Sequence, residues 1–407
     1  MRTWLRLIPV LSMLTALVVA PVQVQAAAPP GPYFNGFEKN LDGWYDSTSP
    51  GPFPNTGFGL ITRQMSDYTN GGGYADGIDS AAGNWHARVT GDCTPDCPGP
   101  KTTWGGYTSV FPQGGYRTQL DMYLDVSWAA SHPDARFDFS SAINTNAPTN
   151  PPTFRRDFVF NVGTQLPLDP AHFRIQSSTN AGRTGANPNF PCPDPSAPPN
   201  YCRLPLIITT SGWYTFRHTF RDGGDGYLDV DFDVFALGSS TPLAHWTIDG
   251  LHDPFSDPMS QVGGNRYGLF ANEEIPDLAI DNSLRTGLCR SGSGDGDVED
   301  KDSGKHGHAH FNGKGCEGGS QGGDVEESDQ NSGDNFQSDS VSSAIFTQDE
   351  SSQTLTMVGT GTHNGLPVAF SVVSVDNGTL APALFSLVLS DGYVITGTVV
   401  NGTVTIQ

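Results

Sequence analysis

The residues best suited to chemistry in this 407-residue chain are three aspartates at alternate positions, Asp229, Asp231 and Asp233. Side chains at positions i, i+2 and i+4 of a strand share one face of a sheet, so three carboxylates gather there. Paired carboxylates can hydrolyse glycosides, and a retaining pair must lie about 5–5.5 Å apart. The α-carbons of residues i and i+4 on a strand are about 13 Å apart, and aspartate is short. The pattern therefore favours a solvated acidic face, with catalysis as the weaker hypothesis.

Other motifs for catalysis are missing from the sequence. It has neither a Gly-x-Ser-x-Gly elbow nor a His-Glu-x-x-His zinc helix. The tract His306-Gly-His-Ala-His310 could chelate a divalent metal, although most such tracts are solvated linkers. An active site assembled from distant residues stays open, because catalytic groups meet in space.

Aromatic residues in glycine-rich loops form a second group of candidates. Sugar rings present apolar C–H faces that stack on exposed aromatic side chains beside hydrogen-bonding groups. The predicted ligand-binding aromatics are Trp85, Trp104, Tyr107, Tyr68 and Tyr74. Tryptophans in or beside strand patterns are expected in the core, namely Trp44, Trp128, Trp213 and Trp246.

The first 26 residues have the pattern of a secretory signal peptide. Arg2 and Arg6 precede an apolar run, and Val24-Gln25-Ala26 has the small-x-small pattern of a cleavage site. No later apolar stretch reaches the length of a membrane span. We therefore expect a secreted, extracellular protein with no membrane span after signal cleavage.

Six cysteines fit an oxidising compartment. They allow 15 connectivities, and we favour pairing of neighbours in sequence because each bridge would close a Gly/Pro-rich excursion. A zinc site at the first pair would need a second Cys or His pair at ribbon spacing. The predicted disulfides are Cys93–Cys97, Cys192–Cys202 and Cys289–Cys316.

The overall composition excludes two classes of protein. With 43 acidic and 21 basic residues the formal charge is −22, which leaves no basic face for nucleic acid. The 49 glycines and 31 prolines interrupt the periodic runs that a helical bundle needs.

Period-two alternation indicates an all-β fold with two domains. In 228–235 apolar Leu and Val residues alternate with the three aspartates, and 116–127 alternates in the same way. We assign 27–290 to a large β-sandwich domain. The hairpin dipeptides Asn364-Gly365, Asp391-Gly392 and Asn401-Gly402 indicate a small β-sandwich or meander barrel over 341–407.

The segment 291–340 between these domains is predicted to be a disordered linker. It has twelve acidic residues against three lysines, much Gly and Ser, and very few apolar residues. Such a composition buries too little apolar surface to offset the entropy of ordering.

Short motifs at both ends of the large domain resemble known families. Phe34-Asn-Gly-Phe-Glu38 and Asp277-Leu-Ala-Ile-Asp-Asn282 are similar to the opening and closing strands of secreted jelly-roll carbohydrate-binding modules and concanavalin A-like domains. That resemblance implies a structural calcium ion at Glu38 and Asp281. Laminarinase-like members carry Glu-x-Asp-x-Glu where this chain has aspartates. The last 67 residues resemble small C-terminal β modules of secreted bacterial multidomain proteins.

The resemblance and the composition together lead to one functional expectation and two alternatives. We expect a non-catalytic protein that binds an extracellular polysaccharide or matrix component. The first alternative is a jelly-roll glycoside hydrolase or polysaccharide lyase that uses the three aspartates. The second is a structural surface or matrix protein without a small-molecule ligand.

Overall fold

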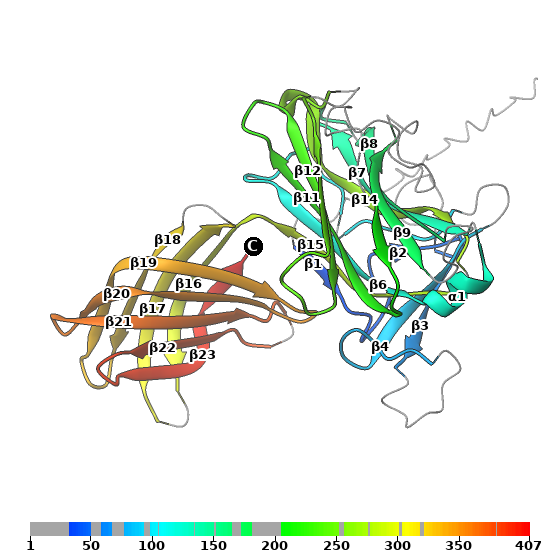
Figure 1. Ribbon diagram of the computed structural model, residues 1–407. Helices are drawn as coiled ribbons and strands as arrows, with labels where there is room; N and C mark the ends of the chain where they lie inside the picture. The colour runs from blue at the N-terminus through cyan, green and yellow to red at the C-terminus, as the bar shows by residue number, and fades with distance from the viewer. Residues whose placement is uncertain are drawn as a thin grey trace, which may run out of the picture.

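The computed structural model describes residues 32–49, 58–66, 77–92, 98–104, 106–133, 135–149, 152–164, 172–180, 205–251, 256–275, 277–300, 303–317, 321–379 and 381–407. The described residues are nearly all β, with 64% in strands and 3% in helices, as expected. Figure 1 shows a sandwich of sheets beside a barrel. No helix among the described residues is long and apolar enough to cross a membrane.

One layer of the sandwich, here called sheet A, has eight antiparallel strands in the order β13-β12-β11-β6-β15-β4-β3, with β1 also paired to β15. Its strands are β1 (Tyr33–Asn35), β3 (Leu60–Met65), β4 (Trp85–Thr90), β6 (Tyr116–Leu124), β11 (Gly212–Asp222), β12 (Leu228–Ala236), β13 (Ala244–Asp249) and β15 (Leu278–Gly287). The predicted strand at 116–127 ends early, because Asp125 caps the short helix α1 (Val126–Ser131) through Ser127 N.

The second layer, sheet B, has seven strands in the order β10-β9-β8-β7-β14-β5-β2. They are β2 (Trp44–Tyr45), β5 (Lys101–Thr102), β7 (Arg136–Thr145), β8 (Phe154–Thr164), β9 (Phe173–Thr179), β10 (Leu206–Ile208) and β14 (Val262–Glu273), with the 3-10 helix η2 (Met259–Gln261) before β14.

Aromatic side chains fill the space between the two sheets. The Phe160 ring of sheet B lies 5.2 Å from Phe216 and 5.0 Å from Phe232, both in sheet A. Both contacts are edge-to-face, an arrangement that adds stability beyond area burial. The alternation predicted from the sequence is confirmed on β12, where Leu228, Val230 and Phe232 point into this core.

The C-terminal part of the chain is a closed barrel of eight antiparallel strands, β16 to β23. Each strand pairs with the next, and β23 pairs back to β16. The strands are β16 (Cys289–Glu299), β17 (His306–Cys316), β18 (Gln321–Asp329), β19 (Asn335–Gln348), β20 (Gln353–His363), β21 (Leu366–Asp376), β22 (Leu384–Leu389) and β23 (Val394–Ile406). A small β-sandwich or a meander barrel was expected over 341–407, and the barrel is confirmed.

The prediction of a disordered linker at 291–340 is wrong. The described residues of this segment form β16, β17, β18 and the start of β19, so the barrel begins at Cys289 rather than near 341. On β17 the inward positions are Gly307, Ala309, Phe311, Gly313 and Gly315, while exposed polar residues alternate with them. The hydropathy of the sequence does not show this period of two, because the inward glycines are small rather than strongly apolar.

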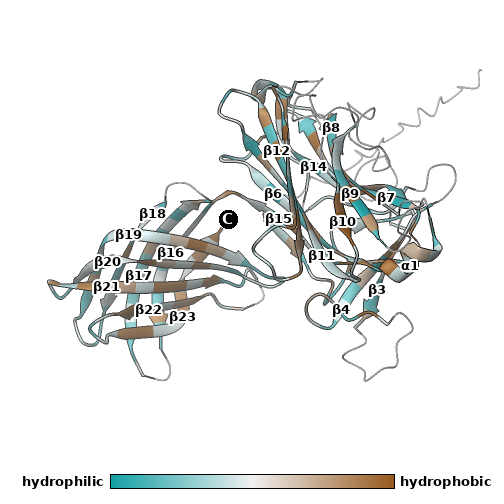
Figure 2. Cartoon of the chain, viewed as in Figure 1, coloured by the Kyte–Doolittle hydropathy of each residue, from teal (hydrophilic) through white to brown (hydrophobic). Residues whose placement is uncertain are grey.

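The inward glycines leave room for large side chains from elsewhere in the barrel. A β-carbon at Gly294 would lie 2.3 Å from the Phe311 ring, and that ring stacks on Phe385 at 5.7 Å. Figure 2 shows the alternation of brown with pale or teal residues along the barrel strands. The interior is therefore a packed core of small and large residues rather than an open channel.

An ion pair and two hydrogen bonds to a carboxylate hold the barrel to the sandwich, and a disulfide joins the first two strands of the barrel. Arg117 of β6 donates to both carboxylate oxygens of Glu317, at 2.5 and 2.6 Å. Glu350, in the β19–β20 turn, accepts the backbone N–H groups of Gly36 and Glu38, both at 2.9 Å. Cys289 and Cys316 form the predicted disulfide at the start of the barrel. The other two predicted disulfides lie outside the described residues.

Overpacking the barrel interior should destabilise the barrel alone. We expect Gly294→Ala to lower the free energy of unfolding of the barrel by about 1–3 kcal/mol, because the Phe311 ring must move. The control Gly322→Ala meets no atom closer than 3.9 Å and should be near neutral. Every tryptophan precedes residue 247, so tryptophan fluorescence follows only the sandwich and calorimetry follows both parts. Equal melting temperatures of the two variants, measured by calorimetry, would contradict this packing.

Candidate functional site

The three aspartates of β12 lie on the outer face of sheet A, each held by an arginine of β11. Arg221 contacts Asp229 at 2.9 Å and Asp231 at 3.0 Å. Arg217 contacts Asp233 at 2.9 Å. The antiparallel register places Arg221 opposite Asp229 and Arg217 opposite Asp233. The solvated acidic face is thus a ladder of cross-strand ion pairs, which joins neighbouring strands.

The ladder continues onto β13, and the pKa values of its carboxyl groups shift in different directions. Burial raises the pKa of Asp229. Burial acts in the same direction on Asp231, but hydrogen bonds from Arg221 and Thr247 outweigh it and lower the pKa of Asp231. Asp233 also accepts a 2.7 Å contact from His245 Nδ1. These partners occupy the carboxylate oxygens that an acid/base mechanism would need, so the arrangement favours a structural role.

Of the three loop aromatics predicted to bind a ligand that the structure describes, two are core residues. Trp104 is 1% exposed and Tyr107 is 6% exposed, so the expectation that they stack a ligand was wrong. Gly268 explains the burial of Trp104, since a β-carbon there would lie 2.0 Å from its ring. Trp85 is half-buried, and the Arg63 guanidinium lies 4.2 Å from its ring centroid. Tyr68 and Tyr74 lie outside the described residues.

The strand tryptophans divide into two groups. Trp44 and Trp246 are buried, as predicted. Trp128 and Trp213 are half-buried instead. Trp213 Nε1 donates to the carbonyl oxygen of Asp79 at 2.6 Å, because this residue points to the outer face of β11, where the segment 77–84 crosses it.

Glu38 and Asp281, the predicted calcium ligands, bind the same short segment of backbone. Glu38 Oε1 accepts the N–H groups of Asn84 and Trp85 at 2.7 and 2.8 Å. Asp281 Oδ2 accepts Ala82 N at 3.2 Å. Backbone N–H groups stabilise an anion and repel a cation, so these oxygens hold the segment 82–85 against sheet A.

A third carboxyl group, which the sequence analysis missed, lies beside Asp281. Asp121 of β6 is the direct cross-strand partner of Asp281 of β15, and both are buried. Burial raises the pKa of Asp121, and burial with the nearby charges of Asp121 and Glu38 raises the pKa of Asp281 to about 8. Thr215 and Asn282 donate to Asp121 at 2.5 and 2.8 Å.

The donors in this cluster do not fit a calcium ion in the present arrangement. Calcium takes six to eight oxygen ligands, whereas the facing oxygens of Glu38 and Asp281 already accept N–H groups. Among the described residues, no group of three or more His, Cys, Asp or Glu side chains is arranged to hold a metal ion.

The buried Asp281 carboxyl predicts a pH-dependent stability. Its folded pKa of about 8 exceeds the unfolded value of about 3.9, so the contribution is full below pH 4 and is lost as pH rises to 8. Asp281→Asn removes this titration, and the stability of the variant relative to the parent should increase by up to about 1.4 kcal/mol per pH unit across that window. Melting temperatures at pH 5 and pH 8 measure it. Parallel pH profiles for the two proteins would contradict a raised pKa.

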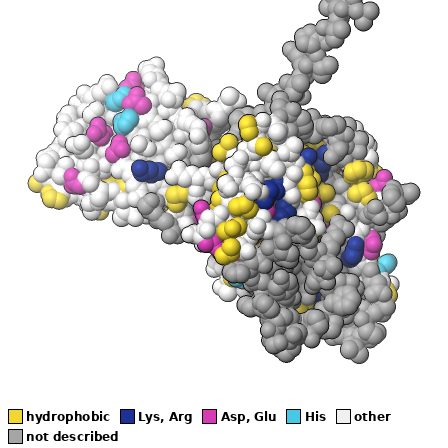
Figure 3. Space-filling view, turned by 90° about the horizontal axis from the view of Figure 1, so that it is seen from above, with side chains coloured by type: hydrophobic (Ala, Val, Ile, Leu, Met, Phe, Trp, Pro, Cys, Tyr) yellow, Lys and Arg dark blue, Asp and Glu magenta, His cyan; other side chains and the backbone are white. Residues whose placement is uncertain are grey.

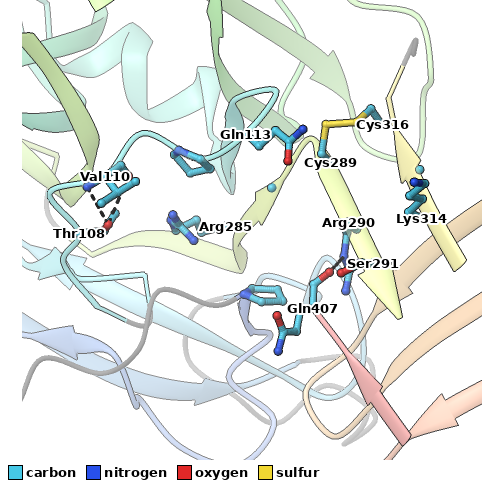
Figure 4. Close-up of a pocket in the computed structure, with 14 residues that line it drawn as sticks. Thr108, Val110, Gln113, Arg285, Cys289, Arg290, Ser291, Lys314, Cys316 and Gln407 are labelled. Atoms are coloured by element: carbon cyan, nitrogen blue, oxygen red, sulfur yellow. Dashed lines mark hydrogen bonds between the residues drawn. A yellow bond between two sulfur atoms is a disulfide. The ribbon is translucent and has the colours of Figure 1, made fainter. Parts of the chain in front are cut away.

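Between the two parts of the molecule lies a cleft of about 540 Å³. Residues of the sandwich, including Pro32, Val110 and Gln113, form one wall, and the first strands of the barrel form the other. Figure 4 shows the Cys289–Cys316 disulfide at its edge, with Arg285, Arg290 and Lys314 around it. The volume is in the range of about 300–1,000 Å³ that is typical of ligand sites. We take this cleft as the candidate functional site.

Two arginines line the cleft, Arg285 buried and Arg290 half-buried. Burial lowers the pKa of Arg285, whose guanidinium lies 5.3 Å from the Tyr116 ring centroid. Burial also lowers the pKa of Arg290 to about 10, so it stays cationic at neutral pH. Arg290 donates to Gln353 Oε1 at 2.6 Å and lies 5.3 Å from the Phe346 ring centroid.

The described side chains that line the cleft suit binding better than acid/base catalysis. They include three cations, amides, hydroxyls and apolar groups, but no Asp, Glu or His. A pair of general acid and base groups is therefore missing from this part of the described chain. Val110 and Gln113 are exposed on the 108–113 loop, where they can contact a ligand.

The sequence alone does not reveal this site, because its residues are scattered along the chain. Arg285 lies near the end of β15, the last strand of the sandwich. Arg290 and Lys314 belong to strands of the barrel. Lys314 had been assigned to the disordered linker, so no pattern placed it near the arginines. The one usable signal was the disulfide prediction at Cys289–Cys316, which brings both strand ends together.

The histidine tract lies on the outer face of β17. His308 contacts Asp297 at 3.1 Å and His310 contacts Asp295 at 3.3 Å, across the β16–β17 pair. Figure 3 shows cyan histidines beside magenta acidic side chains on the barrel surface. The tract therefore forms cross-strand polar pairs within the sheet.

A second titratable cluster closes the end of the barrel farthest from the sandwich. His363 Nδ1 contacts Asp391 at 2.6 Å, and the Tyr393 ring is tilted against His363 with ring centroids 4.8 Å apart. Tyr393 donates to Glu327 at 3.0 Å, and Lys305 lies 4.2 Å from the Tyr393 ring centroid. Glu327 is 2% exposed, whereas Asp391 is exposed and Tyr393 is half-buried.

Glu327 should make the barrel less stable as pH rises. Burial raises its pKa to about 7, above the unfolded value of about 4.3, so its contribution to stability is lost between about pH 4 and 7. Glu327→Gln should flatten this dependence in the calorimetric transition of the barrel. The exposed neighbour Glu326→Gln is the control and should leave the dependence unchanged. A Glu327→Gln profile that follows the parent would rule out this assignment.

Comparisons with known proteins add no relationship to these observations. No protein-family model matches the chain, and no curated protein or solved structure matches it. Functional inference therefore depends on the geometry of the cleft and on the sequence motifs.

Proposed function

We propose that this protein is a secreted, non-catalytic binding protein for an extracellular polysaccharide or matrix component, with the cleft between sandwich and barrel as its binding site. The sandwich would belong to the jelly-roll and concanavalin A-like group that the end motifs resemble. The signal peptide that supports secretion lies outside the described residues.

The observation that carries the proposal is the composition of the cleft. Pro32, Val110 and Pro112 supply apolar surface on which a sugar ring can pack, and Gln113 and Ser291 supply hydrogen-bonding groups. Glycan sites combine these two kinds of surface. Both parts of the molecule contribute, so the site needs the sandwich and the barrel together.

Two observations weigh against the enzymatic alternative. The carboxylates of β12 are held by arginines, and the described side chains of the cleft lack an acid/base pair. A purely structural protein would not need a cleft with concentrated hydrogen-bonding groups. Binding without turnover is therefore the function that the geometry supports best.

A polysaccharide pull-down with a reducing-sugar assay on the same panel tests the proposal. We expect retention of the protein without sugar release. Val110→Asn should weaken retention about three- to tenfold, because it removes apolar contact area, whereas Val388→Asn, exposed on β22 and outside the cleft, should not. Sugar release, or equal effects of the two variants, would contradict a binding site in the cleft.

A further inference from the structure

We propose that the cleft recognises an acidic polysaccharide, in which carboxylate or sulfate oxygens contact Lys314, which is exposed, and Arg290, which is half-buried. This inference depends on the proposed function, because it names the ligand class of the same cleft. The shared chemistry is an anionic oxygen repeated along a glycan chain.

The charge distribution supports an anionic ligand. The chain carries 43 acidic against 21 basic residues, and yet three cations and no acidic side chain are found among the described residues that line the cleft. Most of the acidic surface repels a polyanion, so a local cationic site determines where one can bind. Fields act over about 8–10 Å at physiological salt, which is the scale of such a cleft.

Arg290 is preorganised for this role. Its guanidinium lies against the Phe346 ring and donates to Gln353 Oε1 and to the Gln407 backbone oxygen, so little side-chain entropy is lost when an anion binds. Its planar N–H groups match carboxylate and sulfate oxygens. Arg285 is 4% exposed and lies against Tyr116, so it adds positive charge to the wall of the cleft rather than a contact with the ligand.

Lys314 supplies the charge most open to a ligand. It is exposed on β17 and forms no ion pair with any described residue. The nearest acidic neighbour along the chain, Glu317, is already bound in two contacts by Arg117. Lys314 can therefore pair with an anion on the ligand without breaking a contact of the folded protein.

Matched polysaccharides and variants test the inference. Pectate and fully methyl-esterified pectin differ in free carboxylates, and dextran sulfate and dextran differ in sulfates. We expect each acidic member to bind at least tenfold more tightly than its neutral partner, and the pair with the larger ratio identifies the preferred anion. Binding should weaken as salt rises from 50 to 200 mM.

The variants locate the site. Lys314→Gln should weaken binding of the acidic polysaccharide about three- to tenfold, and Lys314→Glu should weaken it further. Lys39→Gln removes the same charge from an exposed position of the sandwich and should have no effect. Unchanged melting temperatures show that each variant is folded.

The outcomes separate this inference from the proposed function. Equal binding of acidic and neutral members, with loss in Val110→Asn, would overturn the anionic ligand and leave glycan binding intact. Binding of no polysaccharide would overturn both proposals. Acidic binding that both Lys314 variants retain in full would overturn the assignment of the anion site to this cleft.

Discussion

Both parts of this molecule depend on the same constraint, the alternation of inward and outward side chains along antiparallel strands. In the sandwich the inward residues are large, and Phe160, Phe216 and Phe232 meet between two sheets. In the barrel the enclosed space is narrower, so inward glycines of β16 and β17 face large residues such as Phe311 and Phe385. The outward positions are left for polar side chains, and these form the ion-pair ladders and the surfaces of the cleft.

Carboxyl groups serve mainly as structural acceptors in this acidic chain. Glu38, Asp281 and Glu350 accept backbone N–H groups, and the aspartates of β12 accept from arginines. An ionised carboxylate is a strong acceptor, and such hydrogen bonds hold loops that have few apolar residues. The buried members, Asp281 and Glu327, have raised pKa values because burial disfavours their charge.

The cleft lies where the sandwich meets the barrel. The disulfide Cys289–Cys316 joins the first two strands of the barrel, directly after the last strand of the sandwich, and Arg117 and Glu350 hold the parts together. As a result Arg285, Arg290 and Lys314 lie around one space. The concentration of basic residues at this junction contrasts with the acidity of the whole chain and leads to our proposal for the ligand.

The sequence by itself determined the all-β class, the alternation of β12, the disulfide at 289 and 316, and the hairpin turns at Asn364-Gly365 and Asp391-Gly392, whereas the third predicted turn, Asn401-Gly402, lies within β23. These features depend on local periodicity and turn chemistry, which neighbouring residues encode. Only the tertiary structure decided that 291–340 completes a barrel, because its glycines become inward residues only opposite large partners from distant strands. The same holds for the burial of Trp104, the pairing of Asp121 with Asp281, and the cleft, since each depends on residues far apart in the chain.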